Sequence, residues 1–177
     1  MSVPLHYHGL WRRKGIWRSN GSSDLATPVW WFQADQFHID LRIPAERSGV
    51  TGFAGSTVVE GERCEWRPEI AYPFVSPELD AGWMRFDAPD ALHETGVDGS
   101  YHEDWWREAG GPAAGSRVLL PNGRIQYEIR CGDWLARASG MPDGAAEITL
   151  WRRQPSGLWR VLASTIAARE GVLAEQP

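Results

Sequence analysis

The chain has 177 residues, of which 42% are hydrophobic and 23% charged, and its formal net charge is -5. This length favours a single domain with a real hydrophobic core, and the acidic charge argues against a protein that binds the phosphate backbone of a nucleic acid. No apolar run approaches the roughly 20 residues of a membrane span. The N-terminus lacks the apolar segment of a secretory signal, so we expect a cytoplasmic protein without a membrane partner.

Tryptophan is unusually frequent, with 11 residues in the chain. Each ring buries on the order of 150–250 Å², so the composition indicates a thick aromatic core, an aromatic-lined cavity, or both. For any single tryptophan, core packing is the simpler interpretation. Cys64 and Cys131 lie far apart without a CxxC pair, which predicts two separate thiols in a cytoplasmic protein.

The first strong strand pattern lies between Val29 and Pro44. Residues 29–32 and 37–43 predict two strands joined by a turn. The second strand alternates strictly, which is typical of a strand whose two faces have different surroundings. One face carries Phe37, Ile39, Leu41 and Ile43, and the other carries His38, Asp40 and Arg42.

Two hairpins follow. Residues 53–60 and 63–67 flank Gly61, and residues 118–120 and 125–131 flank a Pro-Asn-Gly turn. Other alternating segments predict strands at 83–87, 92–95, 101–107, 133–138, 146–153 and 158–164, and only 164–171 looks helical. Many short strands joined by turns at regular spacing predict an all-β antiparallel barrel or sandwich of about eight to ten strands.

A family resemblance favours the barrel. The segments Gly-Leu-Trp-Arg-Arg (9–13), Ile-Asp-Leu-Arg-Ile-Pro (39–44), Gly-Phe-Ala-Gly (52–55) and Tyr-His-Glu-Asp-Trp (101–105) resemble a group of uncharacterised bacterial proteins predicted to be calycin-like and distantly similar to a fungal barrel protein. The resemblance implies one up-and-down, lipocalin-like barrel domain over 1–177, with its core at about 9–163 and a tail at about 164–177, but no reaction.

The calycin resemblance also gives a role to the GxW element at Gly9–Trp11. In calycins this tryptophan closes the barrel floor and packs on a basic side chain from the last strand. Arg160, in the segment Gly-Leu-Trp-Arg at 157–160, is the candidate partner that the sequence offers.

The row of His38, Asp40 and Arg42 has two interpretations. On a solvated outer face, Arg42 would pair with Asp40 for about 0–1 kcal/mol, and the alternation alone favours this interpretation. Inside a barrel, the same groups would act as base, orienting acid and anion clamp in a binding pocket. The aromatic residues at 30–32 make a purely solvated face less plausible.

Glu103 is the sharper candidate, because it shares a strand face with Tyr101 and Trp105. Burial against aromatic rings raises a carboxyl pKa and produces a general acid or base. The alternative is that Glu103 is a buried carboxylate paired with Arg42 or Arg130.

Metal and cofactor signatures are absent from the sequence, so we expect neither a metal nor a cofactor. His93-Glu94 and His102-Glu103-Asp104 place neighbouring side chains on opposite strand faces. Haem binding would need a histidine that points into the barrel and ligates the iron, and His38 and His93 are the candidates.

The preferred hypothesis is a monomeric or homodimeric barrel that binds a small apolar or aromatic molecule. The alternatives are a cofactor-independent acid/base enzyme (cyclase, isomerase or lyase) using Glu103, His38, Asp40 and Arg42, and a protein-interaction barrel with a packed interior. The expected ligand-binding residues are Trp31, Arg42, Trp66, Trp83, Tyr101, Glu103, Trp105 and Arg130.

Overall fold

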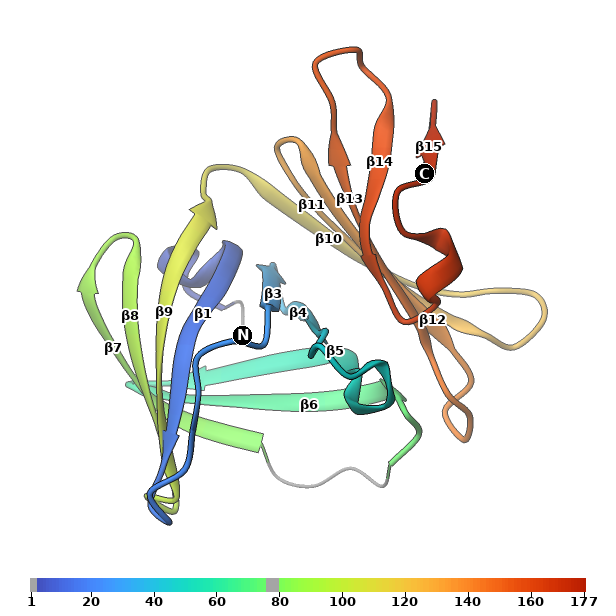
Figure 1. Ribbon diagram of the computed structural model, residues 1–177. Helices are drawn as coiled ribbons and strands as arrows, with labels where there is room; N and C mark the ends of the chain where they lie inside the picture. The colour runs from blue at the N-terminus through green and yellow to red at the C-terminus, as the bar shows by residue number, and fades with distance from the viewer. Residues whose placement is uncertain (1–2, 76–79) are drawn as a thin grey trace.

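The computed structural model describes residues 3–75 and 80–177 as an all-β protein with a closed barrel and a separate sheet (Figure 1). Eight antiparallel strands close the barrel in chain order, because β1 pairs with both β3 and β9. These strands are β1 (Gly9–Arg18), β3 (Val29–Ala34), β4 (Phe37–Arg42), β5 (Thr51–Glu60), β6 (Arg63–Tyr72), β7 (Asp80–Ala88), β8 (Ala91–Gly96) and β9 (Tyr101–Ala109). The short strand β2 (Ser23–Asp24) pairs with the end of β1.

The remaining strands form a second, six-stranded antiparallel sheet beside the barrel (Figure 1). They are β10 (Ala113–Leu119), β11 (Ile125–Cys131), β12 (Trp134–Gly140), β13 (Glu147–Arg153), β14 (Trp159–Ser164) and β15 (Leu173–Ala174). Three short 3₁₀ turns complete the described structure: η1 (Leu5–Tyr7), η2 (Arg47–Gly49) and η3 (Ala167–Arg169).

The predicted all-β, up-and-down antiparallel barrel with little helix is therefore confirmed. The barrel closes earlier than expected, at Ala109 rather than near residue 163, because β9 pairs back onto β1. The predicted helix at 164–171 is reduced to η3. Among the described residues, no helix is long and apolar enough to cross a membrane.

The outer face of the barrel explains the alternation of β4. Ile39 and Leu41 are fully buried, and they belong to a cluster that also contains Ile129, Ile148 and other residues of the second sheet. The apolar face of β4 therefore points out of the barrel and against the sheet. Because the second sheet covers this apolar face, the opposite, polar face of β4 points into the barrel.

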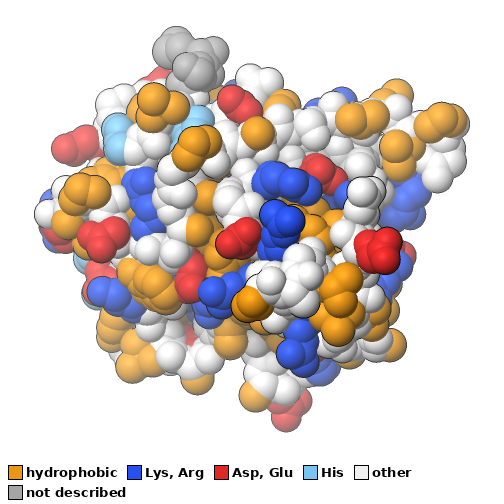
Figure 2. All heavy atoms as spheres, turned by 90° about the horizontal axis from the view of Figure 1, so that it is seen from above, with side chains coloured by type: hydrophobic (Ala, Val, Ile, Leu, Met, Phe, Trp, Pro, Cys, Tyr) orange, Lys and Arg blue, Asp and Glu red, His pale blue; other side chains and the backbone are white. Residues whose placement is uncertain are grey.

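Polar contacts join the sheet to the barrel at its edges. Glu69 on β6 receives hydrogen bonds from Arg117 on β10 and from the hydroxyl of Tyr127 on β11. The backbone N–H of Gly115 donates to Asp35 Oδ2 at 3.0 Å. On the molecular face seen in Figure 2, acidic and basic side chains are interspersed.

The GxW element lies where the barrel closes. Trp11 is fully buried, and the guanidinium of Arg107 stacks over its ring at 4.6 Å. Arg107 belongs to β9, the last strand of the barrel. The prediction that Arg160 packs on Trp11 is wrong, because Arg160 lies on β14 in the second sheet. Gly9 allows this close approach, since a Cβ at that position would clash with the carbonyl oxygen of Ala109.

Candidate functional site

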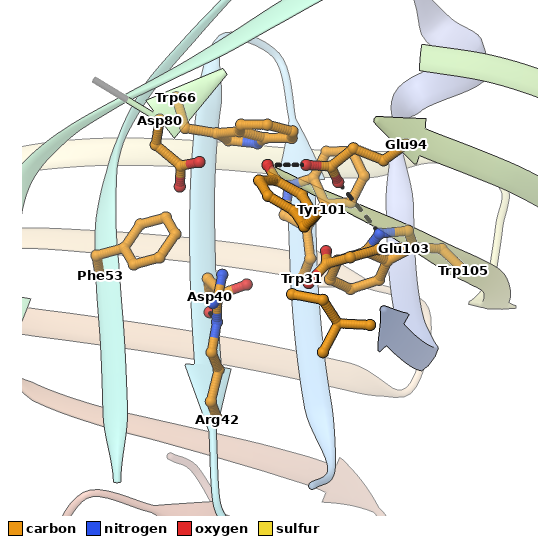
Figure 3. Close-up of a pocket in the computed structure, with 11 residues that line it drawn as sticks. Trp31, Asp40, Arg42, Phe53, Trp66, Asp80, Glu94, Tyr101, Glu103 and Trp105 are labelled. Carbon is orange, nitrogen blue, oxygen red and sulfur yellow. Dashed lines mark hydrogen bonds and ion pairs between the residues drawn. The ribbon is translucent and has the colours of Figure 1, made fainter. Parts of the chain in front are cut away.

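A cavity of about 120 Å³ lies inside the barrel, and every one of its eight strands contributes to the lining (Figure 3). The lining residues are Ile16, Trp31, Asp40, Arg42, Phe53, Trp66, Asp80, Glu94, Tyr101, Glu103 and Trp105. Trp31, Trp66, Glu94, Glu103 and Trp105 are buried, whereas Arg42, Phe53, Asp80 and Tyr101 are partly exposed. The cavity therefore extends from a buried aromatic floor to a partly exposed rim.

Three indole rings form the aromatic part of the cavity. The ring of Trp31 stands edge-to-face against Trp66 at 5.5 Å and against Trp105 at 5.8 Å between centroids. Trp31 is only 2% exposed, and its indole N–H is buried without a hydrogen-bond partner in the described part of the chain. A buried donor without an acceptor costs free energy, so this N–H destabilises the folded protein slightly, whereas the Trp31 ring forms part of the cavity wall.

The polar row of β4 reaches the cavity through Asp40 and Arg42. Arg42 Nε donates to Asp40 Oδ1 at 2.7 Å, and the Asp40 side chain is only 4% exposed. An Arg42–Asp40 pair was expected on a solvated outer face, whereas the structure places this pair inside the barrel. Burial opposes the charge of Arg42, yet Asp40 and Glu103 together raise the pKa of its guanidinium above the usual value.

Glu103 shares one face of β9 with Tyr101 and Trp105, as the alternation predicted, and this face points into the cavity. Its ion-pair partner is Arg13 on β1, with Nη1 2.8 Å from Glu103 Oε1, rather than Arg42 or Arg130. Arg13 also contacts Asp24 at 3.2 Å. Burial raises the pKa of Glu103 even though the positive charges of Arg42 and Arg13 oppose that shift.

Glu94 lies next to Glu103 on the neighbouring strand β8. Its two carboxylate oxygens accept hydrogen bonds from the Tyr101 hydroxyl at 2.7 Å and from the Trp105 indole N–H at 3.2 Å. Burial, followed by the charge of Glu103, raises the pKa of Glu94 well above its usual value.

Asp80 stands at the start of β7, on the side of the cavity opposite Glu103 (Figure 3). No hydrogen bond or ion pair to its carboxylate occurs within residues 3–75 and 80–177. Burial raises its pKa, and the nearby Arg42 only partly offsets this effect. The cavity therefore holds acidic groups whose charge is incompletely neutralised.

Of the sequence-predicted site residues, seven meet at this cavity: Trp31, Asp40, Arg42, Trp66, Tyr101, Glu103 and Trp105. Three do not. Trp83 points outward and is 48% exposed. Arg130 lies on the second sheet, with its guanidinium over the ring of Trp159. His38 is fully buried and does not line the cavity.

His38 belongs to a buried polar cluster with Gln33 and Thr57. The Thr57 hydroxyl donates to Gln33 Oε1 at 2.8 Å, so it accepts from His38 Nδ1 at 3.0 Å. Burial lowers the pKa of His38 to about 3. The imidazole is therefore neutral near pH 7, and its ring packs against that of Phe53, a residue of the cavity wall, at 5.5 Å between centroids. His93, the other histidine considered in the sequence analysis, lies on β8, with its Nδ1 2.6 Å from Asp104 Oδ1.

Glu94, Asp80, Arg13, Phe53 and Ile16 are the site residues that the sequence reasoning missed. The alternation contained a signal for two of them, because Glu94 shares its strand face with Leu92, and Asp80 shares its face with Met84 and Phe86. Arg13 was hidden, since β1 has a register shift between Arg13 and Gly15 that interrupts the period of two.

Both cysteines are free and buried, as predicted. Among the residues that the structure describes, no group of three or more His, Cys, Asp or Glu side chains is arranged to hold a metal ion. Searches of protein-family models, of curated proteins and of solved structures found no match to this chain.

Proposed function

We propose that this protein binds a small molecule in the barrel cavity. The observation that carries the proposal is the convergence of aromatic rings and incompletely neutralised polar groups on one cavity of about 120 Å³. Binding sites combine apolar walls with a few convergent polar groups in this way. A dry cavity of about 150 Å³ accommodates benzene, so the expected ligand is the size of one ring rather than of a fatty acid.

The calycin-like relationship remains a proposal, and the barrel floor supports it. Trp11 of the GxW element stacks with Arg107 from the last barrel strand, which is the pairing that the resemblance implied. In calycins the barrel interior is the ligand-binding space, so this relationship is consistent with binding inside the barrel. The cavity gives no support to a protein-interaction barrel with a packed interior.

An acid/base enzyme is the second candidate, because Glu94 and Glu103 have raised pKa values at the same cavity. Glu103 would transfer the proton, with Asp40 and Arg42 orienting the substrate. His38 has no part in this proposal, since it does not line the cavity. Turnover separates the two candidates once a ligand is known: an enzyme converts the ligand and loses this activity in folded Glu103→Gln protein, whereas a binder leaves the ligand unchanged.

Ligand-observed NMR with a library of ring-sized compounds, followed by tryptophan fluorescence titration of the hits, tests binding. Trp66→Phe and Trp83→Phe form a matched pair, because the two tryptophans lie on neighbouring strands but only Trp66 lines the cavity. We expect Trp66→Phe to weaken binding at least threefold and Trp83→Phe to leave it unchanged. Equal effects of the two substitutions, or no hit in the library, would contradict binding in this cavity.

A further inference from the structure

The charge of the cavity restricts the ligand class. Four carboxylates line it, from Asp40, Asp80, Glu94 and Glu103, whereas Arg42 is the basic residue of the lining. Arg13 adds a second guanidinium behind Glu103. The carboxylates at the cavity therefore exceed the guanidinium groups by two.

The hydrogen bonds show which acids lack a counter-charge. Arg42 neutralises Asp40, and Arg13 neutralises Glu103. Glu94 receives its bonds from the neutral donors Tyr101 and Trp105. Asp80 has no partner among the described residues. Glu94 is 3% exposed, and an isolated charge at such a desolvated position is costly and takes up a proton or a counter-ion, whereas Asp80 lies at the partly exposed rim.

The aromatic residues between these carboxylates favour neutralisation by a bound organic cation rather than by protonation. Trp31, Trp66 and Trp105 lie around the same cavity, with Phe53 and Tyr101 nearer the rim. The negative face of an aromatic ring attracts ammonium groups, and cages of such rings recognise quaternary ammonium ligands such as choline. An anion would instead meet a surplus of carboxylates.

We propose that the cavity binds a compact organic ammonium compound, with the positive charge between Asp80, Glu94 and the indole rings. This inference rests on the proposed function, because it names the ligand class of the same site. A volume of about 120 Å³ is slightly smaller than the cavity of about 150 Å³ that binds benzene, so a compound of the size of choline would extend from the cavity to its partly exposed rim, and a long-chain amine is too large.

Three probes of nearly equal shape isolate the charge: choline, its neutral carbon analogue 3,3-dimethylbutan-1-ol, and the anion 3,3-dimethylbutanoate. Affinities are measured by isothermal titration calorimetry and by saturation-transfer NMR on the full chain. We expect choline to bind at least tenfold more tightly than the neutral alcohol, and the anion to bind more weakly than both.

Asp80→Asn removes one unneutralised charge at the cavity, and Asp87→Asn is its control on the same strand. Asp87 is exposed and pairs with Arg85 outside the barrel. We expect Asp80→Asn to weaken choline binding at least fivefold while changing alcohol binding less than twofold. Asp87→Asn should change neither. Glu94→Gln provides a second charge-removing variant if Asp80→Asn fails to fold.

The outcomes separate this inference from the proposed function. Equal affinities for choline and the alcohol, or binding of only neutral compounds from the ring-sized library, overturn the cationic ligand and leave cavity binding in place. Choline binding that survives both charge-removing variants also overturns it. If neither the three probes nor the library bind, both proposals are wrong.

Discussion

Arg13 on the first barrel strand and Glu103 on the last form an ion pair of 2.8 Å in which both side chains are about 95% buried. The pair therefore connects the two strands whose hydrogen bonding closes the barrel. Because Arg13 also reaches Asp24, one guanidinium neutralises carboxylates from two neighbouring strands.

Removing Arg13 should destabilise the protein strongly. Breaking a buried ion pair from one side leaves an unpaired charge and costs about 3–5 kcal/mol. We expect Arg13→Gln to lower the free energy of unfolding by this amount in urea denaturation, and Arg13→Gln with Glu103→Gln to recover part of it. Arg85→Gln, which breaks an exposed pair, is the control and should cost less than about 1 kcal/mol. Equal costs for the two arginines would contradict the structural role of Arg13.

His38 should make the protein sensitive to mild acid. Its pKa is about 3 in the folded protein and about 6.5 when unfolded. The stability that the neutral imidazole provides is complete above pH 6.5 and is lost as the pH falls, because the unfolded chain binds the proton first. Between pH 6.5 and about 4.5 this loss amounts to about 2–3 kcal/mol.

Urea denaturation at several pH values, with His38→Gln and the exposed His102→Gln as variants, measures this effect. His38→Gln should remove most of the loss between pH 6.5 and about 4.5, and His102→Gln should keep it. An unchanged pH slope in His38→Gln would show that other groups cause the acid sensitivity.

Glu94 should have the opposite effect on the pH dependence of the free energy of unfolding. Its folded-state pKa is raised, so its contribution to stability is fully present below the unfolded value of about 4.5 and is lost as the pH rises above it. The charged or titratable groups around it include Glu103, Asp80, Arg42, Tyr101, Cys64 and Tyr7.

Glu94→Gln mimics the protonated acid and keeps acceptor and donor atoms near Tyr101 and Trp105. We expect its stability relative to the wild type to rise between about pH 4.5 and pH 7 in thermal or urea unfolding. The control is Glu60→Gln, since Glu60 is exposed at the end of β5. A pH-independent difference between Glu94→Gln and the wild type would mean that Glu94 ionises normally in the folded protein.

Gly52 reports on the contact between barrel and sheet. A Cβ at this position would lie 2.7 Å from the Asp40 carbonyl oxygen and 2.8 Å from Ile148 Cδ1. Gly52→Ala should therefore destabilise the protein by about 1–3 kcal/mol through overpacking. Ile148→Val removes Cδ1, so it should cost less in the Gly52→Ala background than in the wild type. Gly144→Ala, with no atom closer than 3.7 Å, is the neutral control. Additive effects of Gly52→Ala and Ile148→Val would contradict the contact.

Much of the site was visible in the alternation of single strands. Tyr101, Glu103 and Trp105 share one face of β9, and Asp40 and Arg42 share one face of β4, and both faces line the cavity. The local period of two was sufficient to group these residues. It was not sufficient for Trp83, because Met84 rather than Trp83 occupies the inward face of β7.

The sequence by itself determined that this protein is all-β and which side chains share each strand face, because the side-chain direction in a strand depends only on local geometry. Tertiary structure decided the rest. The second sheet covers the apolar face of β4 and so turns Asp40 and Arg42 into the barrel. The pairing of β9 with β1 brings Arg13 to Glu103. Both results depend on contacts between residues far apart in the chain, and no local period encodes such contacts.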